Sequence, residues 1–180
     1  MKKLLRKTSS KFATLHSQLS IRKGFTLIEL LIVVAIISAL AIAVFVALNP
    51  AQRLKDAKDA RRTADANTIL TAVHASIVDT KGSLPAGLTT GMLETQLGTG
   101  TAAQCSPVVT GGCSVAATTA CVNLATPLVK YLKSMPISPD SGATTYTAIN
   151  TGYSVIVDAN NIVTIKACGT EGTTNISASR

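Results

Sequence analysis

The stretch GFTLIELLIVVAIISALAIAVFVAL, residues 24–48, decides the fold of this chain. From Phe25 to Leu48 it has 24 residues and a single charge, that of Glu29. As a helix it would span about 36 Å, which is enough to cross a hydrocarbon core of about 30 Å. The sequence therefore predicts a membrane-spanning helix with one carboxylate just inside its beginning.

Basic residues are concentrated ahead of this helix. Seven of the 17 lysines and arginines lie in residues 1–24, where there is no acidic residue. From Phe25 onward, ten basic residues face nine acidic ones, so the basic balance does not indicate a nucleic-acid-binding surface. The positive-inside rule predicts that the N-terminus stays in the cytoplasm and that the C-terminal part crosses the membrane.

Two ordinary interpretations explain part of this pattern. A secretory signal peptide fits the small residues Ala39-Leu40-Ala41, but its basic region would be long and Glu29 would fall inside its apolar part. A plain membrane anchor explains the length but not the carboxylate, which costs about 3 kcal/mol at the centre of a bilayer and less near its edge.

A third interpretation explains more. The residues GFTLIE (24–29), followed by LLIVVAIISALAIAV, resemble the processing site of type IV pilins and type II secretion pseudopilins. The resemblance is strong over residues 22–50 and loose beyond them. It implies that a prepilin peptidase cuts after Gly24 and methylates the amine of Phe25. It also implies that Glu29 pairs with the Phe25 amine of a neighbouring subunit, so that neither charge is stranded in a medium of low dielectric.

The helical pattern continues beyond Asn49-Pro50. Proline removes a backbone hydrogen bond and disfavours helical geometry before it, so Pro50 marks a helix boundary or, as we expect, a kink. Gly82 and Pro85 end the pattern. The expected segments are a leader (1–24), a membrane and filament-core half-helix (25–48), an amphipathic half-helix (49–81) and a globular head (82–180).

The head shows short elements. Strands are predicted at Tyr153–Val157, Ile162–Ile165 and Thr144–Ile149, with a turn at Asn160-Asn161 and a short helix at Leu124–Leu132. The fold class is therefore α+β, with a long N-terminal helix packed on a small antiparallel sheet of three or four strands. This order of elements again resembles the pilin fold.

Four cysteines lie in the head: Cys105, Cys113, Cys121 and Cys168. Their even number predicts two disulfides outside the membrane, and the absence of a CxxC pair makes a zinc site a poor interpretation. Three connectivities are open. The turn-forming residues Thr110-Gly111-Gly112 favour Cys105–Cys113, which leaves Cys121–Cys168 to fasten the sheet to the connecting segment.

Catalytic and ligand-binding patterns are weak. No serine or cysteine has a plausible histidine partner, and no glycine loop suits a phosphate, so neither an enzyme nor a cofactor is expected. Asp140, near Ser138 and Ser141, has too few acidic neighbours for a calcium site, and no metal is expected. Arg61-Arg62 would suit DNA uptake, but a solvated helix face is the simpler interpretation, and nucleic acid is an unlikely partner.

The resemblance implies a filament subunit that assembles with copies of itself. It would be held in the cytoplasmic membrane with its head outside, and would then enter an extracellular or periplasmic filament. Its other partners would be the prepilin peptidase and methyltransferase and, indirectly, an assembly ATPase and a membrane platform protein. A pilus subunit, a secretion pseudopilin and a DNA-uptake pilin all fit, and so does a different class, a membrane-anchored exported domain that does not assemble.

Overall fold

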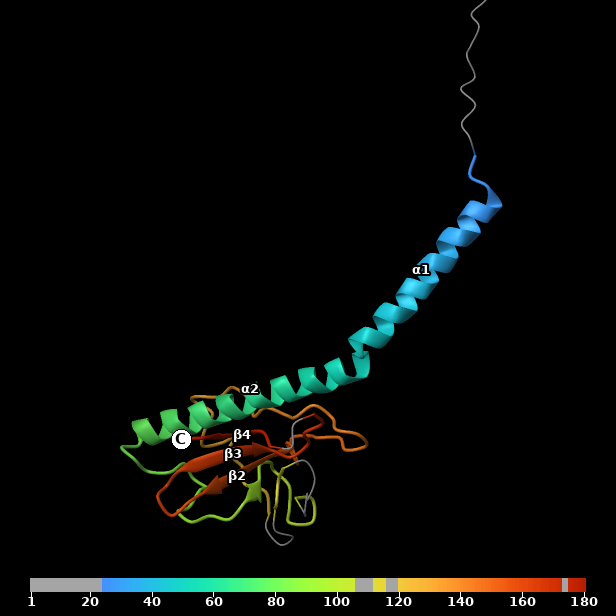
Figure 1. Ribbon diagram of the computed structural model, residues 1–180. Helices are drawn as coiled ribbons and strands as arrows, with labels where there is room; N and C mark the ends of the chain where they lie inside the picture. The colour runs from blue at the N-terminus through green and yellow to red at the C-terminus, as the bar shows by residue number, and fades with distance from the viewer. Residues whose placement is uncertain (1–23, 106–111, 116–119, 173–174) are drawn as a thin grey trace, which may run out of the picture. The chain divides into compact units, whose positions relative to one another are not determined.

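A computed structural model describes residues 24–105, 112–115, 120–172 and 175–180 (Figure 1). Two helices precede four strands along the chain. The chain divides into two units, of which the first ends at Val46 and the second begins at Ala47.

Helix α1 (Leu27–Leu48) contains most of the described residues of the first unit. Its 22 residues correspond to about 33 Å, and every one of them is exposed. The described part of the chain contains one helical stretch long and apolar enough to cross a membrane, and α1 is its apolar portion. A helix that is apolar all round, with none of its surface covered, is suited to lipid or to other helices.

Asn49 separates α1 from helix α2 (Pro50–Asp79). Its backbone is left-handed, with φ 40° and ψ 70°, and its side-chain oxygen accepts a hydrogen bond from the Gln52 N–H at 3.4 Å. Asn49 is thus the N-cap of α2, and Pro50 occupies the first helical position, where a missing N–H costs nothing. A bend at Pro50 stays a prediction.

Helix α2 ends two residues before the predicted Lys81. Lys81 takes a left-handed φ of 58°, and its N–H donates to the Val78 carbonyl at 3.2 Å. The Gly82 N–H donates to the Ile77 carbonyl at 2.8 Å. These two bonds form a Schellman motif, which satisfies carbonyls that the helix end would leave free.

The head contacts only part of α2. Residues 50–57 are exposed on all sides, and burial begins at residues 58–59. Farther along, α2 buries Ala66, Ile69, Leu70 and Val73 against the sheet. The predicted apolar face of the second half of this helix is therefore confirmed as core, whereas the small residues of its first half face outward.

The sheet has four antiparallel strands in the order β1-β2-β3-β4. The strands are β1 (Thr95–Gln96), β2 (Tyr153–Val157), β3 (Val163–Ala167) and β4 (Ser177–Ser179). Val155 pairs with Ile165 at the centre of β2–β3, and both are fully buried. Helix α2 packs on β3 and β4, which gives the α+β, pilin-like arrangement expected from the sequence (Figure 1).

The hairpin between β2 and β3 closes as predicted at Asn160-Asn161. Asn161 takes a left-handed φ of 65°, which asparagine tolerates. The Asp158 carboxylate accepts hydrogen bonds from the backbone N–H groups of Asn160 and Ile162, at 2.8 and 2.7 Å.

Two predicted elements are wrong. Thr144–Ile149 is not a strand, because the Thr147 and Asn150 backbones bond to each other and close a tight turn. Strands β1 and β4 complete the sheet instead. The segment Leu124–Leu132 forms hydrogen-bonded turns rather than a helix. The Leu128 N–H donates to the Leu124 carbonyl, and the Leu132 N–H donates to the Leu128 carbonyl.

Candidate functional site

The peptide bond between Gly24 and Phe25 lies in an exposed segment just before α1. A Cβ added at Gly24 would meet nothing within 4 Å, and Phe25 is 91% exposed. The fold of the chain itself therefore does not require glycine at position 24. A requirement for glycine there would come from a partner that binds the backbone closely, as the resemblance implies for the peptidase.

Thr26 and Glu29 form a capping box at the start of α1. The Glu29 Oε2 atom accepts from the Thr26 N–H at 2.8 Å and from the Thr26 hydroxyl at 2.9 Å. The Glu29 N–H in turn donates to Thr26 Oγ1 at 3.2 Å. Reciprocal bonds of this kind satisfy N–H groups that have no partner within the helix, and a carboxylate is favourable beside the positive end of the helix dipole.

The capping box gives Glu29 a partner within its own chain. Both bonds from Thr26 reach Oε2, and none of the described residues is bonded to Oε1. One oxygen therefore serves the helix while the other stays available to a second group. The role of Thr26 was missed from the sequence, although the spacing Thr-x-x-Glu before an apolar run is a signal for this cap.

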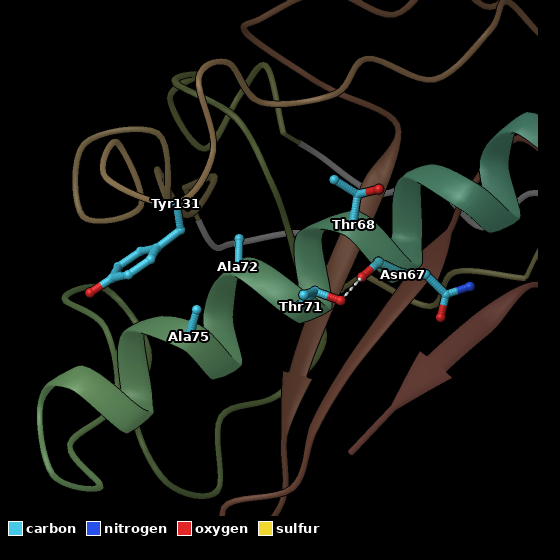
Figure 2. A pocket seen from close by; sticks show the side chains of 6 residues that line it. All are labelled: Asn67, Thr68, Thr71, Ala72, Ala75 and Tyr131. Atoms are coloured by element: carbon cyan, nitrogen blue, oxygen red, sulfur yellow. Dashed lines mark hydrogen bonds between the residues drawn. The ribbon is translucent and has the colours of Figure 1, made fainter.

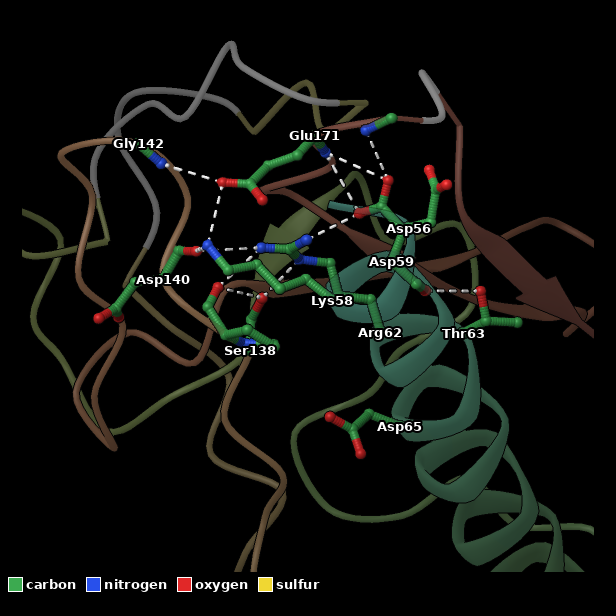
Figure 3. A network of polar contacts seen from close by, with 12 residues as sticks. Asp56, Lys58, Asp59, Arg62, Thr63, Asp65, Ser138, Asp140, Gly142 and Glu171 are labelled. Carbon is green, nitrogen blue, oxygen red and sulfur yellow. Dashed lines mark hydrogen bonds and ion pairs between the residues drawn. The ribbon is translucent and has the colours of Figure 1, made fainter. Parts of the chain in front are cut away.

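A polar network fastens α2 to two loops of the head (Figure 3). Its centre is Arg62, which is fully buried and donates to Asp59 Oδ1 at 2.7 Å. Arg62 also donates to the Ser138 hydroxyl at 3.1 Å and to the Pro139 carbonyl at 2.8 Å. Buried guanidinium groups are stable only when paired and hydrogen-bonded in this way.

Glu171 extends the network to the loop before β4. Its carboxylate accepts from Lys58 Nζ and from the Gly142 N–H, both at 3.3 Å. The backbone N–H groups of Glu171 and Gly172 donate to Asp59. Burial raises the pKa of Glu171, but the Gly142 N–H and the Lys58 ammonium outweigh burial and hold that pKa below its usual value.

The two adjacent arginines have different environments. Arg61 is exposed and lies 3.7 Å from Asp65, whereas Arg62 is enclosed in the network. Only Arg61 of the pair is therefore accessible to a phosphate backbone, so the DNA-uptake interpretation of Arg61-Arg62 loses half of its basis.

All four cysteines form disulfides, but the predicted pairing is wrong. The bonds join Cys105 to Cys121 and Cys113 to Cys168. The Cys105 N–H bonds to the Thr101 carbonyl and the Cys121 N–H to the Gly100 carbonyl, so one short segment brings both cysteines together.

Cys113 instead lies in a small buried cluster with Val115 and Cys168. Its sulfur is 3.2 Å from the Ser154 hydroxyl of β2. The turn-forming residues before Cys113, which favoured a local pair, do not decide the pairing, because the sheet fixes the position of Cys113.

A shallow groove of about 400 Å³ runs along α2 beside Tyr131 (Figure 2). The Thr71 hydroxyl donates to the Asn67 carbonyl and the Thr68 hydroxyl to the Ala64 carbonyl, so the polar groups of the groove already bond within the helix. In the part of the chain that the structure describes, no group of three or more His, Cys, Asp or Glu side chains is placed to hold a metal.

The comparison with known families agrees with the geometry of the N-terminal segment. Residues 19–45 match the prokaryotic N-terminal methylation motif, which is the prepilin-type signal of type IV pilins and pseudopilins. The match covers the signal and most of α1 and does not extend to the head. No curated protein and no solved structure matches the chain. Signal and apolar helix together fit a membrane-anchored pilin precursor that is a substrate of prepilin peptidase.

Proposed function

We propose that this protein is the structural subunit of a type IV pilus or of a related filament such as a secretion pseudopilus. The observation that carries the proposal is the methylation motif at residues 19–45, placed on a helix that is apolar and uncovered on every side. Such a surface is stable in lipid before assembly and among neighbouring helices afterwards. The head supplies the outer part of the subunit, with segment boundaries near residues 24, 48 and 81.

We further propose that Glu29 pairs with the methylated Phe25 amine of a neighbouring copy. The capping box supports this role, because its bonds occupy Oε2 and leave Oε1 for an incoming cation. Cleavage after Gly24 does not disturb the box, since the peptide bond that carries the Thr26 N–H stays intact. Pairing would bring two charges together in a low-dielectric layer, where either one alone is costly.

The remaining partners follow from this role. Before assembly the subunit spans the cytoplasmic membrane once, with its head outside; afterwards it lies in an extracellular or periplasmic filament. The prepilin peptidase acts on it directly, and an assembly ATPase acts through a membrane platform protein.

Gly24→Leu tests the proposal, and Ala41→Leu is its matched control. The first change should leave the chain about 24 residues longer than the mature form and abolish sheared filaments. The second blocks a small-residue signal-peptidase site and should leave processing unchanged. N-terminal mass analysis should find a methylated Phe25. A mature chain that begins at Ile42, or one that retains Met1, would overturn the proposal.

A further inference from the structure

The two disulfides cross one another along the chain. Cys113 lies inside the loop closed by Cys105–Cys121, and its own partner, Cys168, lies outside that loop. The native pairs are 16 and 55 residues apart, whereas Cys113 is only eight residues from both Cys105 and Cys121. Neither native bond joins neighbouring cysteines.

Loop closure favours the wrong pairs in the unfolded chain. The probability that two residues meet falls roughly as the −3/2 power of their separation. An eight-residue loop therefore closes about 3 times more readily than the 16-residue loop and about 18 times more readily than the 55-residue loop. Cys113 belongs to both short pairs, so early oxidation uses up the cysteine that should form the native bond to Cys168.

A mispaired chain cannot correct itself once it is fully oxidised. If Cys105–Cys113 forms first, Cys121 and Cys168 are left to pair with each other, and no thiolate remains to start an exchange. Disulfide exchange requires an attacking thiolate. We propose that this protein is a client of a thiol–disulfide isomerase, a partner that carries a reduced thiol and acts on the side of the membrane where the head folds.

The exchange balances without an oxidant or a reductant. The thiolate of the isomerase attacks Cys113 of the Cys105–Cys113 bond, and the Cys105 thiolate leaves. That thiolate attacks Cys121 of the Cys121–Cys168 bond, which forms Cys105–Cys121 and releases the Cys168 thiolate. The Cys168 thiolate attacks Cys113 of the mixed disulfide, which forms Cys113–Cys168 and regenerates the isomerase.

The folded head explains why the sequence of exchanges stops at the native pairs. Cys113 is 4% exposed, with its sulfur against the Ser154 hydroxyl of β2, and Cys168 is fully buried. Cys105 is also fully buried. An external thiolate reaches Cys113 and Cys168 only before the head has folded over them, so the Cys113–Cys168 bond is protected from further attack. Cys121 is partly exposed. An attack there releases the Cys105 thiolate, which returns to Cys121 because the other disulfide is enclosed.

The test refolds the full chain in detergent after reduction and unfolding. One sample is oxidised by ferricyanide, which carries no thiol, and disulfide-linked peptides are mapped by mass spectrometry. Links from Cys113 to Cys105 or Cys121 should exceed native links. After removal of the oxidant, a catalytic amount of reduced protein disulfide isomerase should convert them to the native pairs. Native pairs that already predominate without thiol, or a map that the isomerase leaves unchanged, would overturn the proposal.

A double variant supplies the matched control. Cys105→Ser with Cys121→Ser removes every competitor of Cys113–Cys168, so this bond should form in ferricyanide alone and gain nothing from the isomerase. A threefold or greater gain in rate for this variant would show that the isomerase acts on folding rather than on pairing, and would contradict the proposal. If the variant does not fold, the disulfide map of the four-cysteine chain still decides.

Discussion

Thr26 and Glu29 bind each other across the first turn of α1 through three hydrogen bonds. The Glu29 carboxylate, which is proposed to hold subunits together, therefore also caps the helix on which it lies. Its side chain is held toward the N-terminus of α1, close to Phe25, which is proposed to become the first residue of the mature chain. Capping and the proposed assembly role use the same group, and substitutions that separate the two roles can be chosen.

Thr26→Val removes the hydroxyl while keeping the shape of the side chain. The first turn of α1 should lose about 1 kcal/mol of stability, which is typical of a lost N-cap. Amide hydrogen exchange in micelles should then be several times faster at residues 27–29. Thr26→Ser keeps the hydroxyl and is the control. Equal exchange in both variants would show that the hydroxyl does not cap this helix.

Glu29→Gln and Glu29→Ala separate capping from charge. Glutamine serves in a capping box as glutamate does, but it cannot neutralise an amine. Membrane insertion should persist in both variants, because each removes a charge from the apolar segment. Sheared-filament yield should fall strongly in both, because neither side chain can neutralise the Phe25 amine. Recovery of filaments with glutamine alone would assign Glu29 to capping and exclude the proposed pairing.

Arg62→Met should destabilise the head by about 3 kcal/mol. Removing one partner of a buried ion pair is expensive because the other, here the Asp59 carboxylate, stays buried without the guanidinium that neutralises it. The control is Arg61→Met on the exposed neighbouring residue, which should cost under about 1 kcal/mol. Denaturant unfolding followed by near-ultraviolet circular dichroism gives both values. Similar losses for the two variants would contradict the buried network.

Glu171→Gln tests the pH dependence of the loop before β4. The pKa of Glu171 is lower in the folded chain than its unfolded value of about 4.3, so its carboxylate stabilises the fold above that pH. This contribution is lost as the pH falls through the folded pKa. The Tm difference between the unchanged chain and Glu171→Gln should therefore shrink from pH 7 to about pH 3. A constant difference would show that the charge of Glu171 contributes nothing.

The sequence predicts the features that depend on local pattern. The apolar helix, the second half of α2 and the hairpin at Asn160-Asn161 follow from periodicity and turn chemistry, and the structure has them. The GFTLIE signal is likewise local. Thr26 could have been identified in the same way, from its spacing to Glu29.

Features that depend on distant contacts were predicted poorly. The disulfide pairing was wrong because Cys113 is positioned by Ser154 and Cys168, which are 41 and 55 residues away in sequence. Strand β4 has only three residues, too few for a periodic pattern, and forms because β3 offers it a free edge. Arg62 looked like an ordinary surface charge, since the loop at Ser138–Asp140 that encloses it is far along the chain.

The crossed disulfides also set how far the head can be stretched. Cys105 and Cys168 are 63 residue steps apart along the backbone, which corresponds to roughly 210 Å when fully extended. With both bonds intact, the shortest covalent route between them follows eight residue steps to Cys113 and then the bond to Cys168. That route measures only about 30 Å. A pull applied between α2 and β4 can therefore extend the chain before Cys105 and after Cys168, but the unfolding of the 63 steps between these two cysteines adds only about 30 Å.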